Sequence, residues 1–225
     1  MLDRIQRNLR RVHEQIAASA KRACREPSDI TLICVTKSVW LDEIRCLYEL
    51  GERNFGENRV DVMLEKMDAL DDLSINWHLI GHLQRNKVSR LAKSNKQFAA
   101  IHSIESIALM DTIEKHHFYT KAFLEVNVAD EESKYGVKLS EVEDFVKYIK
   151  NTACITLQGL MTMAPICTNQ EHSRHWFKQL REIRNKIQDI YKYEKLDLSM
   201  GMSQDFEIAI EEGSTYVRVG SALFE

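Results

Sequence analysis

The chain has 225 residues, of which 44% are hydrophobic and 29% are charged, so a soluble globular protein with a substantial core is expected. The formal net charge of −3 excludes a general electrostatic attraction to nucleic acid or to anionic membranes. No apolar run is long enough to span a bilayer, and the N-terminus lacks the apolar segment of a secretory signal.

The apolar periodicity predicts one leading helix followed by strands that alternate with helices. The first helix follows the 3.6-residue spacing of Ile5, Leu9, Val12 and Ile16. The helices are expected at 2–25, 41–50, 58–69, 84–93, 105–116, 140–150, 170–190 and 204–212. The strands are expected at 30–37, 54–57, 76–81, 98–103, 121–128, 156–163, 196–200 and 215–219.

Four residues have the chemistry of helix ends. Gly51 and Gly213 stand where a helix C-terminus needs a residue that tolerates the left-handed region of backbone space. Ser140 and Ser203 stand at expected N-caps, where a hydroxyl can accept a hydrogen bond from a free backbone N–H. These residues support the predicted helix limits.

Repeated strand–helix units favour right-handed crossovers and a parallel sheet. Eight of them predict an α/β fold of the (β/α)₈ TIM-barrel type, preceded by an N-terminal helix and forming one domain over 1–225. The alternative is an open doubly wound sheet, which usually carries a glycine-rich turn after its first strand. The turn here reads "KSVWLD" and has no glycine.

A barrel of this type carries its active site at the C-terminal ends of its strands. Unusual polar residues and one methionine fall at or just after those predicted ends: Lys37, Asn58, His82, Gln84, Asn127, Met163, Ser203 and Arg218. Lys37 ends the apolar run "ITLICVTK", and an inward-pointing lysine there could serve as a nucleophile. The competing interpretation is a lysine whose amine merely extends to the barrel rim.

The tail of the chain indicates an anion site. In "SMGMSQDF" a strand leads into Ser203 and a helix start, where backbone N–H groups and the hydroxyl can bind an anion. The next strand ends in "RVGSA", where Gly220 lets the backbone approach a ligand closely. Loops after strands 7 and 8 form the usual phosphate site of such barrels. The competing interpretation is that Ser203 only caps a helix. A lysine nucleophile and a phosphate site together suit pyridoxal 5′-phosphate (PLP).

The chain resembles the pyridoxal phosphate homeostasis protein family, a relative of the alanine racemase barrel. The resemblance covers about residues 1–224, and its most specific part is "WHLIGHLQRNKVSRL" at 77–91. The other matching segments are "VTK" at 35–37, "FGENRV" at 55–60, "IHSIES" at 101–106, "VNVADEESKYGV" at 126–137, "GLMTMAP" at 159–165 and "LSMGMSQDFEIAIEEGSTYVRVGSALF" at 198–224.

The resemblance implies a role for each matching residue. Lys37 would form the internal aldimine, and the phosphate would be held by Ser203, Gly220 and Ser221. Arg218 would face the pyridine nitrogen. Asn58 would lie near the ring or its 3-hydroxyl group. His82 and Met163 are candidate pocket walls.

Two functions stay open at this point. The first, which the resemblance favours, is a cytoplasmic and mostly monomeric carrier that buffers PLP and passes it to PLP-dependent apoenzymes without robust turnover. The second is a PLP-dependent amino-acid racemase of the alanine racemase type, which needs an acid/base group on each face of the substrate. Formation of D-amino acids would distinguish them.

Other patterns favour no further site. The cysteines, Cys24, Cys34, Cys46, Cys154 and Cys167, are odd in number and scattered, so a reducing cytosol is expected and a disulfide or zinc framework is not. His78 and His82 fall on a strand and its following loop and lack a third ligand, so no metal site is expected. The five cations of 84–96 could attract RNA or another anion, but they suit a solvated helix face better.

Overall fold

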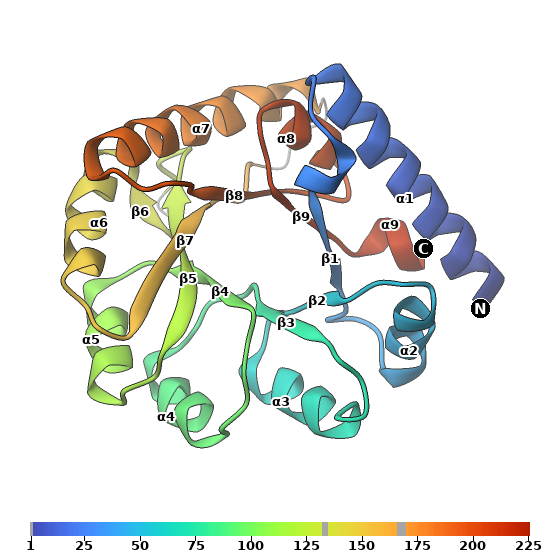
Figure 1. Ribbon diagram of the computed structural model, residues 1–225, viewed down its shortest axis with the longest axis horizontal. Helices are drawn as coiled ribbons and strands as arrows, with labels where there is room; N and C mark the ends of the chain where they lie inside the picture. Colours follow the sequence, from blue (N-terminus) through green and yellow to red (C-terminus); the bar gives the residue numbers. More distant parts are fainter. Residues whose placement is uncertain (1, 132–134, 166–169) are drawn as a thin grey trace.

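Parallel strands close into a ring in this computed structural model, which describes residues 2–131, 135–165 and 170–225 (Figure 1). The ring runs in the order β4-β3-β2-β1-β9-β8-β7-β5, and a β4–β5 pairing closes it, while β6 adds to β5 outside the ring. The strands are β1 Thr31–Val35, β2 Asn54–Glu57, β3 Asn76–Leu79, β4 Ala100–Ile104, β5 Thr120–Asn127, β6 Val137–Lys138, β7 Ile155–Met161, β8 Asp197–Met202 and β9 Tyr216–Val219.

Helices surround this ring and bury their apolar faces against the outside of the strands (Figure 1). Short 3₁₀ turns occupy Pro27–Asp29 and Leu139–Glu141. The α-helices are α1 Leu2–Arg22, α2 Leu41–Glu49, α3 Val60–Ala69, α4 Arg85–Lys93, α5 Ile107–Lys115, α6 Val142–Lys150, α7 Glu171–Tyr191, α8 Phe206–Glu211 and α9 Ser221–Phe224. None of these described helices combines the length and apolarity that crossing a membrane requires.

Helix α1 lies along the outside of the barrel, against α8 and α9 (Figure 1). Its predicted apolar stripe is buried, with Val12 fully buried at its centre. Polar contacts fix the same face, because Gln15 Nε2 donates to Glu207 Oε1 at 2.9 Å and Asn8 Nδ2 donates to the Leu223 carbonyl at 3.1 Å. The first and last parts of the sequence therefore pack together.

The structure confirms the predicted (β/α)₈ barrel with its leading helix, and it excludes the open sheet because the ring is closed. Gly51 and Gly213 both have positive φ, at 105° and 97°, as their predicted positions require. The sequence analysis missed the two-residue strand β6 and the short helix α9, which are too short to show a periodicity. Cys167 lies outside the described residues.

Most predicted limits shift by one to three residues, and three of the wrong limits concern residues named above. Strand β1 ends at Val35, and Lys37 lies in a turn that the Val39 N–H closes by donating to the Thr36 carbonyl at 3.1 Å. Ser140 lies within a 3₁₀ turn, so it does not cap α6. Asp205 precedes α8 in place of Ser203, and its Oδ1 accepts from the Met202 N–H at 2.7 Å.

Candidate functional site

The predicted site residues follow or end four strands that are consecutive around the ring. In the order β8, β9, β1 and β2, these strands carry Ser203, then Arg218 with Gly220 and Ser221, then Lys37, then Asn58. Because all four strands run in parallel, their C-terminal ends meet at one end of the barrel. The candidate site is therefore one arc of the barrel mouth.

The hydroxyl of Ser203 joins the end of β8 to the end of β9. Its Oγ accepts from the Gly220 N–H at 3.2 Å and from the Ala222 N–H at 3.3 Å, on either side of the exposed Ser221. Gly220 also packs against the end of β1, because a Cβ built on it would lie 3.4 Å from the Val35 Cβ. The amide-rich end of β9 thus lies beside the strand that leads to Lys37.

The Lys37 side chain is exposed, but the backbone of the turn that carries it is held by a buried side chain of α3. Lys66 of α3 donates from Nζ to the carbonyls of Thr36 and Val39, both at 2.8 Å, and to Glu57 Oε1 at 2.7 Å. The same Glu57 oxygen accepts from Thr36 Oγ1 at 2.6 Å. We call Lys66, Glu57, Thr36 and Val39 the turn clamp. The structure therefore places Lys37 in an exposed turn beyond the end of β1 and not within the strand itself.

Arg218 points into the barrel and is only 4% exposed. Its Nη1 donates to Ser199 Oγ at 2.6 Å, and its Nη2 donates to the Thr162 carbonyl at 2.9 Å. Burial lowers the pKa of Arg218 to about 10, while Asp205 and Glu125 oppose this shift. The guanidinium therefore stays charged at neutral pH and acts only as a hydrogen-bond donor.

A chain of hydrogen bonds continues from Arg218 across the barrel interior, and we call Ser199, His102, His78 and Asn54 the histidine relay. Ser199 Oγ lies 2.8 Å from His102 Nδ1, and His102 Nε2 lies 3.0 Å from His78 Nδ1. His78 Nε2 lies 3.2 Å from Asn54 Oδ1. Burial lowers the pKa of His78 to about 4 and holds the pKa of His102 well below its usual value, so both rings are neutral at pH 7.

The neutral rings fix the direction of every donor in the histidine relay. Asn54 Oδ1 can only accept, so His78 carries its proton on Nε2 and accepts at Nδ1. His102 must then donate from Nε2 and accept at Nδ1 from the Ser199 hydroxyl. Ser199 in turn accepts from Arg218. Donation therefore runs one way, from the guanidinium to the amide oxygen.

Two acidic residues with perturbed pKa values lie on the neighbouring strands β4 and β5: Glu105 directly follows β4, and Glu125 is buried within β5. Glu105 Oε1 lies 2.8 Å from His82 Nδ1, and burial raises the pKa of Glu105. Burial also raises the pKa of Glu125 on β5 to about 7, and the nearby Glu105 charge adds to this shift. The ring of Tyr135 stacks on His82 with centroids 4.4 Å apart. In the strand order, β4 and β5 lie across the ring from β1, which leads to the Lys37 turn.

The remaining predicted residues lie at the rim. Asn58 is exposed and packs against Gly81, where a Cβ would lie only 2.3 Å from the Asn58 carbonyl oxygen. Met163 is 40% exposed beyond the end of β7. Among the described residues no hydrogen bond or ion pair joins Asn58 or Met163 to Lys37, so their place beside a ligand stays a prediction.

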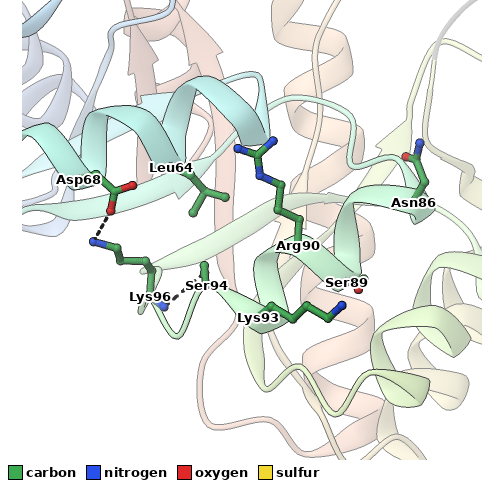
Figure 2. Close-up of a pocket in the computed structure, with 8 residues that line it drawn as sticks. All are labelled: Leu64, Asp68, Asn86, Ser89, Arg90, Lys93, Ser94 and Lys96. Atoms are coloured by element: carbon green, nitrogen blue, oxygen red, sulfur yellow. Dashed lines mark hydrogen bonds and ion pairs between the residues drawn. The ribbon is translucent and has the colours of Figure 1, made fainter.

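A cavity of about 520 Å³ lies away from this mouth, between α3 and α4 (Figure 2). It is the region of the basic segment 84–96. Lys96 pairs with Asp68 at 2.8 Å along its edge, and Asp61 pairs with Lys87 at 2.8 Å and with Arg90 at 2.5 Å. Three of the five cations are thus neutralised locally, which favours the solvated-face interpretation. The described residues contain no cluster of metal ligands.

The sequence analysis missed most of the groups that support the site. Lys66 lies three residues after Met63 and four before Leu70, on a helix face whose other members are buried, and that spacing could have identified it. Glu57 lies two residues after the buried Phe55 of β2, on the same face of the strand. No comparable local signal connects His102 with Ser199, which lie 97 positions apart.

Comparison with known proteins gives consistent matches over the whole chain. The family model of the alanine racemase N-terminal domain matches residues 1–225. A pyridoxal phosphate homeostasis protein of Aquifex aeolicus is 40% identical over 220 residues, which cover 96% of this chain and 95% of the relative.

Two solved structures have the same fold at similar identity. The structure of PipY from Synechococcus elongatus PCC7942 with PLP bound has a TM-score of 0.80 and 31% identity, and it covers 95% of this chain and 100% of PipY. A protein of Bifidobacterium adolescentis, described as unknown, has a TM-score of 0.90 and 32% identity over 99% of this chain and 95% of its own.

Proposed function

The chain belongs to the pyridoxal phosphate homeostasis protein family, and from this membership we propose that it binds PLP through an imine with Lys37 and buffers the cofactor without robust turnover. In forming the imine, the Lys37 amine adds to the aldehyde carbon and one water leaves. Residues 1–225 would act as one PLP-binding barrel domain, largely monomeric and cytoplasmic. PLP-dependent apoenzymes would receive the cofactor.

One observation carries the proposal. An exposed amine after β1 lies beside the amide-rich end of β9, where Ser203 Oγ already gathers the Gly220 and Ala222 N–H groups. The Lys37 amine can react with an aldehyde, and the backbone amides at the end of β9 can bind a phosphate. The residues present therefore fit PLP, which carries both groups. A Cβ at Gly220 would lie in van der Waals contact with Val35, at 3.4 Å from its Cβ, so the end of β9 lies close to the end of β1.

Arg218 would set the electronic character of the bound ring. PLP supplies an electron sink that is strongest when its pyridine nitrogen is protonated, and enzymes that use the sink fully place a carboxylate there. The charged, donor-only guanidinium of Arg218 would instead keep that nitrogen unprotonated. This supports a protein that holds a reactive aldehyde without consuming it.

Two further predicted contacts belong to this proposal. Asn58 would approach the ring or its 3-hydroxyl from the end of β2, and Ser221 would add to the phosphate contacts from the start of α9. The cytoplasmic location is supported by free thiols at Cys24, Cys34, Cys46 and Cys154.

The test is borohydride reduction of the protein saturated with PLP, followed by peptide mapping. We expect the label on Lys37, and we expect Lys37→Ala to lose the imine absorbance. Lys138→Ala is the matched control, because Lys138 is an exposed lysine of β6 and should leave the label in place. A label on another lysine would contradict the assignment; Lys134, the other candidate, lies outside the described residues.

The alternative function is tested with the same preparation. The holoprotein is incubated with L-alanine and with other amino acids, and the D-isomers are measured. The carrier proposal predicts negligible racemisation. Turnover at about 1 s⁻¹ or faster, the range of ordinary enzymes, would contradict it and favour a PLP-dependent amino-acid racemase.

A further inference from the structure

Lys66 is an unusual residue for a helix that packs on a barrel, because its whole side chain is buried. The side chain is 1% exposed, and its partner Glu57 is 0% exposed. A lysine ammonium has three N–H donors, and here each has an acceptor at 2.7–2.8 Å. Two of those acceptors are the backbone carbonyls of Thr36 and Val39, which flank Lys37 on either side.

Glu57 connects the same turn to the end of β2. Its Oε1 accepts from both Lys66 Nζ and Thr36 Oγ1, so the carboxylate fixes the side chain of the residue directly before Lys37. The backbone adds a further link, since the Thr36 N–H donates to the Gly56 carbonyl at 3.0 Å. The turn is therefore attached to β2 and to α3 as well as to its own strand.

Stability alone does not account for this arrangement. A buried ion pair often stabilises a protein no more than apolar residues of the same size, because both charges lose their hydration. The Glu57 carboxylate is also incompletely bonded, since its Oε2 is buried without a hydrogen-bond partner among the described residues. What an apolar pair could not do is bind the two carbonyls on either side of Lys37.

Trp40 completes the enclosure. Its ring lies 5.3 Å from Lys66 Nζ, a cation–π distance, while the residue itself is 54% exposed at the rim. The ammonium is thus covered on the solvent side, so water does not compete for the Thr36 and Val39 carbonyls.

We propose that Lys66 and Glu57 are positioning residues that hold the Thr36–Val39 turn in the one backbone conformation from which the Lys37 amine reaches the aldehyde of PLP. This inference rests on the proposed function. It assigns no contact with PLP to either residue: Lys66 and Glu57 act through the backbone and through Thr36. Their effect should therefore appear in imine formation and not in the affinity for the rest of the cofactor.

The experiment uses the double variant Glu57→Leu with Lys66→Met, which removes both buried charges together. Two probes are compared by stopped-flow absorbance and by equilibrium titration: PLP, and 4′-deoxypyridoxine 5′-phosphate, which has no aldehyde. We expect imine formation to slow by about 10- to 100-fold, because displacing a reacting group by about 1 Å can cost on the order of 100-fold. Affinity for the analogue should change by about twofold or less.

The matched control is Lys96→Met with Asp68→Leu, which removes an exposed lysine–carboxylate pair that also involves α3 (Figure 2). It should leave both probes unaffected. Thermal unfolding verifies that each variant is folded. If Glu57→Leu with Lys66→Met does not fold, Glu57→Gln with Lys66→Met is measured with the same expectation, since it keeps an acceptor for Thr36 Oγ1.

The outcomes separate this inference from the proposed function. If the unaltered protein forms the imine at Lys37 and the folded double variant forms it as fast and as completely, the positioning role is overturned and the proposed function stands. If the double variant loses the same affinity for PLP and for the analogue, the positioning role is overturned too, because such losses indicate that the whole site is disturbed. If the unaltered protein forms no imine at Lys37, the proposed function fails and this inference fails with it.

Discussion

The Lys37 turn and the Arg218 guanidinium lie at neighbouring strands, β1 and β9, but they are held by opposite means. The turn clamp uses a buried ion pair, Lys66 with Glu57. Arg218 is held by two neutral acceptors, and the histidine relay behind it carries no charge at neutral pH.

The difference follows from what each assembly has to bind. The turn presents the Thr36 and Val39 carbonyls to α3, so a cation is the strongest donor available, and that cation then requires a buried counter-charge. Arg218 is itself the cation, and neutral acceptors leave its charge available to a ligand. The clamp should therefore be sensitive to loss of one partner, and the relay should be sensitive to acid.

The largest effect should come from breaking the charge pair on one side only. Lys66→Met leaves the Glu57 carboxylate buried and unpaired, so we expect the free energy of unfolding in urea to fall by about 3–5 kcal/mol. Adding Glu57→Leu should recover most of that loss. A loss of less than about 1 kcal/mol, the range of an exposed pair, would show that Glu57 does not depend on Lys66 for its charge compensation.

Acid should act on the relay. Native His78, with its pKa lowered from 6.5 to about 4, binds fewer protons than the unfolded chain between those values, so its contribution to stability is lost as pH falls from about 6.5 to about 4. We compare unfolding of the unaltered protein with that of His78→Gln. The free energy of unfolding of the unaltered protein minus that of His78→Gln should rise by up to about 3 kcal/mol as the pH is raised from about 4 to about 6.5. His172→Gln, at an exposed position of α7, is the control for replacing a histidine as such. If the difference for His78→Gln falls as the pH rises, the pKa of native His78 is not lowered.

A smaller effect should follow from Ser199→Ala. The variant removes the hydroxyl that accepts from Arg218 and donates to His102, so a charged group loses one hydrogen bond. We expect the free energy of unfolding to fall by about 1.5–3 kcal/mol. Ser28→Ala, at an exposed position, is the control. If the two variants unfold alike, Ser199 does not connect the guanidinium to the relay.

The smallest effect should come from an exposed pair. Lys96→Met separates Lys96 from Asp68, whose side chains are 32% and 71% exposed, so water replaces the lost interaction. The expected change in unfolding free energy is at most about 1 kcal/mol. Added salt should reduce it further, because exposed charges are screened. A loss as large as that of Lys66→Met would remove the contrast between buried and exposed pairs.

The barrel was predictable because each strand and each long helix carries its own periodicity, and alternation of the two permits few topologies. The arc of site residues was predictable for the same reason, since Lys37, Ser203 and Gly220 each follow the end of a strand. The limits of the elements were predicted less accurately. Strand β1 ends before Lys37 because the Thr36–Val39 turn is held by Lys66, which lies on α3 and leaves no signal in the sequence of the strand.

The members of the histidine relay could not be predicted because they depend on which strand faces which across the barrel. His102 and Ser199 are ordinary residues in their own strands and become partners only when the ring closes. Ser203 illustrates the same limit: local pattern made it a helix cap, whereas the structure makes it the link between the ends of β8 and β9. Long-range contacts of this kind leave no trace in local composition.

The one-way order of donors in the histidine relay also gives the barrel an internal reporter. The His78 and His102 rings are 3% and 0% exposed, and Phe123 stacks on His102 with centroids 4.3 Å apart, so bulk water has little access to their N–H protons. Such protons exchange with solvent only when the structure opens locally. Their nuclear magnetic resonance signals should therefore persist in water, and loss of those signals would register an opening of the barrel interior before the fold as a whole is lost.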